Sequence, residues 1–285
     1  MGAVHRLVPA FSIILVCAIA QAQDAGALRS RHAALHQHLT QSPFGRSLHV
    51  ESTVSGSTQK GEIYVVIDHP FSVVGPALAR PQDWCEVLTV QVNLKRCSPV
   101  SDGAGAMTLA TFITRKPRDA VENAHRVDFR YQVAATSADY LHVGLNAPSG
   151  PMGTRDFEIR LEAAPLDARR TFMHMSYTYT LGSMGRIAMD AYLAGAGRDK
   201  TGFSVVDRLP DGKPVYVDGV RGVVERSAMR YYLAIEAHLD SLGAPRGQRL
   251  EARLRRWYAA IERHPQLREQ VSRDEYVDMK RRELG

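Results

Sequence analysis

Long hydrophobic runs are almost absent from this sequence, so a protein built of membrane-spanning helices is excluded. The one apolar run, LVPAFSIILVCAIA at residues 7–20, is too short to span a bilayer and follows a single basic residue, Arg6. Small residues stand at Ala20 and Ala22, as they do at a secretory cleavage site. We therefore expect residues 1–22 to be a signal peptide and the mature protein to be exported, either periplasmic or secreted.

Cysteine is also scarce, with three in the whole chain. Cys17 lies in the expected signal peptide, which leaves Cys85 and Cys97. An even number of cysteines in an oxidising compartment predicts a disulfide, and two buried thiols are the alternative. A redox-active pair would need closer spacing, so a catalytic dithiol is not expected.

The sequence also lacks catalytic motifs, and it has no large net charge. The chain has no nucleophile elbow, no metal-binding His/Glu helix and no phosphate-cradling loop. His36 and His38 are two residues apart, which on a helix places them on different faces and disfavours a metal site. The net charge of +6 is mild for this length. With export, it argues against nucleic acid as a partner, while acidic small molecules and anionic lipids remain compatible. The sequence predicts no catalytic residue, no metal and no cofactor.

What the sequence does contain is alternation of apolar and polar residues through residues 47–182. Ile63 and Val65, for example, alternate with Glu62 and Tyr64. This period of two is typical of an antiparallel sheet with one buried and one solvated face. His142 and His174 fall on the outward phase and are predicted as surface histidines. The eight predicted strands lie around residues 48–50, 63–67, 90–94, 107–113, 127–133, 141–145, 157–163 and 173–181.

A helical segment interrupts this series after the second strand. The stretch IDHPFSVVGPALARPQDWCEVL, residues 67–88, carries apolar residues at helical spacing, among them Val74 and Leu78. Pro76 is expected to kink or divide it, and Pro81 to end the first of two short helices.

Helical spacing returns after residue 182. The sequence predicts a helix in GSMGRIAMDAYLAG and a loop or hairpin over residues 196–217 with its turn at Asp211-Gly212. A long amphipathic helix is expected at about residues 219–242. A basic amphipathic helix follows at residues 249–263, and a short one starts near Ser272. Residues 23–46 are also expected to be helical.

This order of elements resembles the START-like, or SRPBCC, helix-grip superfamily, which includes polyketide-cyclase, lipid-transfer and pollen-allergen branches. The resemblance covers about residues 47–242 and rests on GEIYVVIDHPFSVVGPALARPQDWCEVL. In this segment a strand ends at an acidic residue, a proline starts a helix and an aromatic residue closes the second helix. The matching positions are Asp68, Pro70, Val74, Leu78, Pro81 and Trp84.

The resemblance implies an α+β helix-grip fold, in which a curved antiparallel sheet packs on a long C-terminal helix. The Cys85–Cys97 bridge would then tie the second short helix to the neighbouring strand. Residues 243–285 lie outside the family's pattern and form extra C-terminal helices.

A cavity between sheet and helix is the expected binding site, because small-molecule sites are concave and mostly apolar. The alternative is that the same inner-face residues simply fill the core. The candidate ligand-binding residues are Phe129, Tyr131, Phe157, Ile159, Met173, Met175, Tyr177 and Tyr179.

The predicted function is the binding of an apolar or amphipathic ligand, such as a lipid, without chemical change. One alternative is a cyclase- or hydrolase-type enzyme, which would need a titratable group beside Tyr177 or Tyr179. The other is a non-catalytic interaction module that docks a partner, or a membrane surface through helix 249–263.

Overall fold

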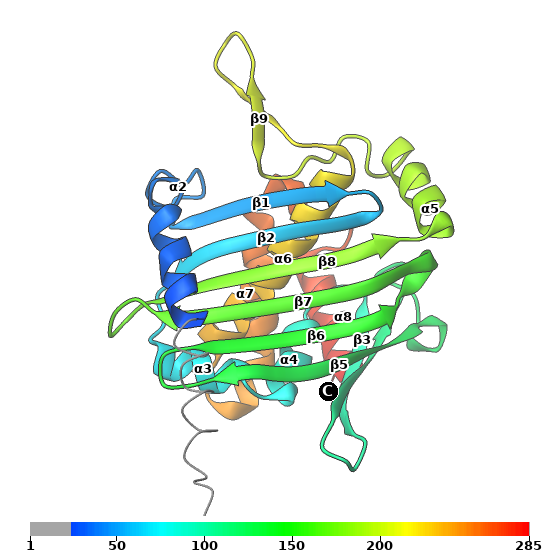
Figure 1. Ribbon diagram of the computed structural model, residues 1–285. Helices are drawn as coiled ribbons and strands as arrows, with labels where there is room; N and C mark the ends of the chain where they lie inside the picture. The colour runs from blue at the N-terminus through cyan, green and yellow to red at the C-terminus, as the bar shows by residue number, and fades with distance from the viewer. Residues whose placement is uncertain (1–23, 285) are drawn as a thin grey trace, which may run out of the picture.

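The computed structural model describes residues 24–284, so the expected signal peptide lies outside the described residues. A single eight-stranded antiparallel sheet forms its centre, in the order β1-β2-β8-β7-β6-β5-β4-β3 (Figure 1). The sheet thus has the predicted number of strands, and seven of the eight lie where they were predicted. The strands are β1 (Leu48–Ser55), β2 (Thr58–Ile67), β3 (Leu94–Ser101), β4 (Met107–Ile113), β5 (His125–Thr136), β6 (Leu141–Ser149), β7 (Thr154–Pro165) and β8 (Thr171–Leu181).

Two short helices connect β2 to β3, as the sequence predicted: α3 (Phe71–Leu78) and α4 (Pro81–Leu88). Pro81 occupies the first turn of α4, where a missing N–H costs nothing. Pro76 lies inside α3 without dividing it, so the expected division was wrong. A proline this near the end of a short helix removes only one hydrogen bond. The indole of buried Trp84 donates to the carbonyl of Leu78 at 2.8 Å and fixes the angle between the two helices.

The third strand begins later than predicted. Val90 and Val92 lie in turns between α4 and β3, and the strand starts at Leu94. Both valines are buried, and the carbonyl of Val90 accepts a hydrogen bond from the hydroxyl of Tyr276. A buried irregular turn can show the same alternation as a strand, which explains the error.

A disulfide joins Cys85 in α4 to Cys97 in β3, with their Cα atoms 5.2 Å apart. This is the pairing that the sequence and the resemblance predicted. The bridge fixes the end of the helix pair against the edge of the sheet, on the side where β3 and β4 lie.

The long helix α6 (Gly219–Ser241) lies across one face of the sheet, where the sequence placed it. It lies close to Gly61 in β2, where a Cβ atom would lie 2.8 Å from the carbonyl oxygen of Val224. Only glycine allows this contact. Sheet, short helices and α6 share one hydrophobic core, so the architecture is the α+β helix-grip fold that was predicted.

The C-terminal helices α7 (Arg249–Glu262) and α8 (Arg273–Leu284) belong to the same core. Leu254, Trp257 and Ile261 of α7 are buried, and the indole of Trp257 donates to the carbonyl of Arg230 in α6. The apolar stripe of helix 249–263 therefore packs inside the protein, so its apolar side chains are not available to a membrane surface. Among the described residues, no helix has the length and apolar character needed to cross a bilayer.

The opposite, outer face of the sheet is covered at one end by residues 24–34 and α2 (His36–Thr40). Their apolar side chains pack on strand residues that point outward. His174 lies on this face but is not a solvated surface histidine. It stacks on Tyr64 and lies between Glu62 and Glu162, at 3.0 and 3.2 Å. Burial lowers the pKa of His174, but the hydrogen bonds to Glu162 and Glu62 outweigh burial and raise it.

An insertion separates β8 from α6. It consists of α5 (Ser183–Ala194) and a hairpin of β9 (Val205–Arg208) and β10 (Pro214–Tyr216), which projects from the sheet (Figure 1). Gly212, with φ of 84°, forms the turn that was predicted. The buried carboxylate of Glu225 in α6 accepts the backbone N–H groups of Phe203 and Ser204 and so anchors the insertion.

Candidate functional site

Two cavities flank α6, on opposite faces of this helix. Ser227, Arg230 and Tyr231 face one cavity, whereas Tyr232 and Glu236 face the other. These positions diverge on a helix with about 3.6 residues per turn. We call the first, on the side of β3 to β5, the grip cavity, and the second, beside β1, the edge cavity.

The grip cavity has a volume of about 630 Å³ and lies between α6 and the inner face of the sheet. Its apolar and aromatic lining comes from the strands, from the turn before β3 and from α6. A volume of this size is typical of small-molecule sites. The apolar and aromatic lining residues are Val92, Leu94, Ile113, Val127, Phe129, Phe157, Tyr177 and Tyr231.

Three of the eight predicted ligand-binding residues line the grip cavity: Phe129, Phe157 and Tyr177. The other five do not line it and are buried within the core. These five residues pack in the core, which was the alternative, because α6 and the short helices cover the part of the sheet where they lie. These five are Tyr131, Ile159, Met173, Met175 and Tyr179.

Aromatic rings form one wall of the grip cavity. The ring of Tyr177 lies 5.0 Å from that of Tyr231 in α6 and 6.2 Å from that of Phe157. Burial raises the pKa of Tyr177 well above its usual value and that of Tyr231 to about 12. Both phenols are therefore neutral at pH 7 and can donate a hydrogen bond to a ligand.

Charged side chains in the lining of the grip cavity were not predicted. The single carboxylate, Glu269, accepts a hydrogen bond from Arg230 at 3.0 Å. No histidine lines the cavity. The cationic lining residues are Arg115, Lys116, Lys200, Arg230 and Arg268.

Sequence reasoning missed these cations because nothing in the local pattern distinguishes them. Arg115 and Lys116 follow β4, Lys200 lies in the insertion and Arg268 follows the last turn before α8. Each resembles an ordinary surface residue in its own segment. What they share is a position at the same cavity. The fold brings them together from segments up to 153 positions apart, which the sequence alone does not show.

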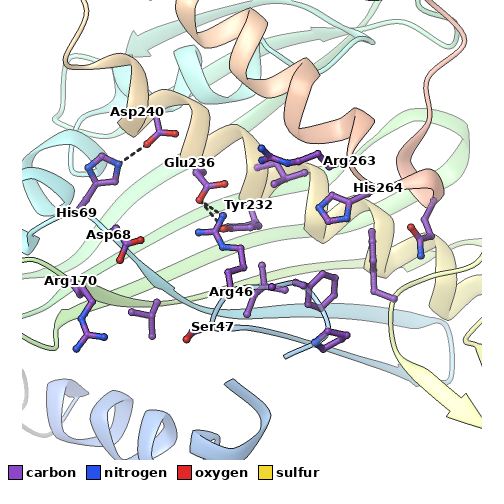
Figure 2. A pocket seen from close by; sticks show the side chains of 18 of the residues that line it. Arg46, Ser47, Asp68, His69, Arg170, Tyr232, Glu236, Asp240, Arg263 and His264 are labelled. Atoms are coloured by element: carbon purple, nitrogen blue, oxygen red, sulfur yellow. Dashed lines mark hydrogen bonds and ion pairs between the residues drawn. The ribbon is translucent and has the colours of Figure 1, made fainter. Parts of the chain in front are cut away.

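The edge cavity is larger, about 890 Å³, and more polar (Figure 2). Arg46 reaches across it to Glu236, at 2.5 Å, and its guanidinium lies over the ring of Tyr232. His69 pairs with Asp240 at 2.8 Å. Two of the carboxylates that line the edge cavity are thus already paired within the protein.

The remaining groups of the edge cavity do not create an excess of one charge. Its lining holds three arginines and three carboxylates. The additional histidine, His264, packs edge-on against Phe203. Burial, followed by the nearby charges of Arg263 and Arg46, lowers the pKa of His264. None of these residues was predicted as a site.

A third cluster joins α4 to α6 and α7. Asp83, Glu86 and fully buried His238 place donor atoms within 4.8 Å of one another. Arg80 and Arg253 form hydrogen bonds with the two carboxylates, at 2.5 and 2.6 Å. Two guanidinium groups at these carboxylates make a partly exposed ion-pair network that fits packing of the helices better than a metal ion.

Comparisons with known proteins find only distant structural likenesses. Neither a protein-family model nor a curated protein matches the chain. Among solved structures, the Zhui aromatase/cyclase from Streptomyces sp. R1128 is 16% identical, with 72% of this chain and 96% of that chain covered and a TM-score of 0.37. Ara h 8.0201 is 13% identical, with 65% of this chain and 99% of that chain covered and a TM-score of 0.38.

Human StAR-related lipid transfer protein 5 also aligns, with 8% identity over 61% of this chain and 89% of that chain, at a TM-score of 0.33. The chain has the helix-grip fold. Its own strand order and the position of α6 establish this assignment, and the predicted START-like resemblance is confirmed at the level of the fold. These distant likenesses carry no statement about ligand or activity.

Proposed function

We propose that this protein is an exported binding protein that holds an apolar or amphipathic small molecule in the grip cavity without changing it chemically. The observation that carries the proposal is the cavity of about 630 Å³ between the sheet and α6, with its wall of aromatic side chains. The Cys85–Cys97 disulfide and the signal-like residues 1–22 support export to an oxidising compartment.

The polar groups of the grip cavity favour binding over catalysis. Tyr177 and Tyr231 keep their protons at neutral pH, and the one carboxylate is held by Arg230. General acid–base catalysis needs a group that exchanges a proton near the working pH. The third possibility, a module that docks through its C-terminal helices, is disfavoured because α7 and α8 are built into the core.

Blocking the grip cavity tests the proposal. Ser227 is half-buried on the cavity side of α6, and Ser227→Trp would place a large ring in the space. We expect binding of the neutral apolar fluorophore N-phenyl-1-naphthylamine, followed by fluorescence titration, to weaken by about tenfold or more, because overpacked space must be reopened.

Ser47→Trp is the matched control, since Ser47 lines the edge cavity. It should leave the affinity for the fluorophore unchanged, and circular dichroism would verify that both variants fold. Loss of binding in Ser47→Trp alone would place the ligand in the edge cavity instead. No binding to the unmodified protein, with no small molecule co-purifying in native mass spectrometry, would refute the proposed function.

A further inference from the structure

The cations that line the grip cavity come from separate parts of the chain, and three of the five are exposed. Arg115 and Lys116 are exposed on the loop after β4, and Arg268 is exposed near α8. Lys200 and Arg230 are half-buried and lie on the insertion and on α6. The apolar wall lies deeper, since Phe129 is buried. The cavity thus has an aromatic interior and a cationic rim.

The charge of this rim is not neutralised by the protein. Arg230 is paired with Glu269, and both side chains are largely buried. The other four cations form no ion pair within residues 24–284, and the lining holds no second carboxylate. Asp119, which lies next to this loop, accepts the backbone N–H of Lys116 and not its ammonium group. Four positive charges therefore remain available to a bound molecule.

We infer that the ligand of the grip cavity is an anionic amphipath, with an apolar chain or ring system inside and a carboxylate or phosphate head group at the rim. This inference rests on the proposed function and specifies its ligand class. The apolar part of the ligand is removed from water in the interior. Arginine and lysine side chains at the rim form charge-assisted hydrogen bonds with its head group. Tyr177 and Tyr231 can add neutral donors deeper in the cavity.

The edge cavity does not satisfy these conditions. Its arginines and carboxylates are equal in number, and Arg46 and His69 are engaged with Glu236 and Asp240. An anion entering it would meet three carboxylates in the lining, whereas the lining of the grip cavity holds one. The preference for anions is accordingly assigned to the grip cavity alone.

Competition with the neutral fluorophore separates head-group recognition from apolar binding. Dodecanoate, dodecyl phosphate and 1-dodecanol share one chain length and differ in the head group. We expect both anions to displace N-phenyl-1-naphthylamine at about tenfold lower concentration than 1-dodecanol, as several partly exposed charges would allow. The difference should shrink at high salt. If only one anion shows the preference, that anion identifies the head group as carboxylate or phosphate.

Removing rim charges provides the decisive variant. Arg115→Gln/Lys116→Gln changes two exposed residues and should abolish most of the anion preference, with the affinity for the fluorophore measured beside it. Arg208→Gln/Lys213→Gln removes the same charge from the projecting hairpin, away from both cavities, and should change neither value. Equal displacement by 1-dodecanol and the two anions would overturn the inference and leave the proposed function intact. Absence of fluorophore binding would overturn both.

Discussion

The two cavities lie on opposite faces of the same helix and differ in how their charges are used. The edge cavity is the larger, but its three arginines are balanced by three carboxylates in the lining, and Arg46 and His69 are paired with Glu236 and Asp240. The grip cavity is smaller, is lined by aromatic rings and keeps four cations without a partner among the described residues. Volume alone would select the edge cavity. Cations without an ion pair next to an apolar interior select the grip cavity, because these charges can still bind an anionic group of another molecule.

Removal of the disulfide should have the largest effect on stability of the changes proposed here. It should affect binding in the grip cavity and leave the edge cavity unchanged. Cys85 and Cys97 enclose the turn at Gln91–Leu94 that lines the grip cavity. Cys85→Ser/Cys97→Ser should lower the free energy of unfolding by about 3 kcal/mol, because the unfolded chain gains freedom. Urea denaturation would measure this loss. The variant should also bind the neutral fluorophore more weakly at temperatures where it remains folded.

Reduction of the unmodified protein is the control for that variant, since it breaks the same bond without changing a residue. A double variant with unchanged stability and affinity would show that the bridge does not shape the grip cavity, and this would weaken the distinction between the two sides of α6.

Breaking the charge pair of the edge cavity should have a smaller effect on stability and none on binding. Glu236→Gln leaves the guanidinium of Arg46 without its carboxylate partner in a partly buried position. We expect a loss of about 2 kcal/mol in the free energy of unfolding, the usual value for a hydrogen bond to a charged group. Chemical denaturation and fluorophore titration would be measured together.

Asp240→Asn is the matched variant, because its pair with His69 is more exposed. It should cost less than about 1 kcal/mol. A large loss of fluorophore affinity in Glu236→Gln would contradict the separation of the two cavities.

The smallest expected effect is a pH dependence confined to the edge cavity. The pKa of His264 is lowered in the folded protein, so between that value and about 6.5 the unfolded chain binds more protons. The stability that His264 contributes is therefore present above pH 6.5 and is lost as the pH falls through the folded pKa. His264→Gln should remove this part of the pH dependence.

Denaturation of both proteins at pH 5 and pH 7.5 would measure the difference. Fluorophore affinity should stay constant over the same range, because no histidine lines the grip cavity. Affinity that changes with the protonation of His264 would link the two cavities through α6.

Much of the fold could be predicted from the sequence, because the signals are local. Alternation located the strands, and helical spacing located α6 within a residue. Val90 and Val92 misled because alternation reports burial and not strand geometry. Pro76 misled because its effect depends on its place within α3.

The candidate site was predictable only in part. Phe129, Phe157 and Tyr177 were found because inner-face residues alternate along a strand. Met173 and Met175 share that alternation but are packed in the core, since the sequence does not reveal where α6 touches the sheet. Arg230 and Lys200 carry no local signal of any kind.

The sequence by itself determined seven of the eight strands, the order of the helices and the cysteine pair, because each depends on short-range periodicity or on composition. Only the tertiary structure decided which inner-face residues border open space, which histidine lies between two carboxylates and which cations meet at one rim. Those properties depend on distances between segments far apart in the chain, and no periodicity along the sequence encodes such distances.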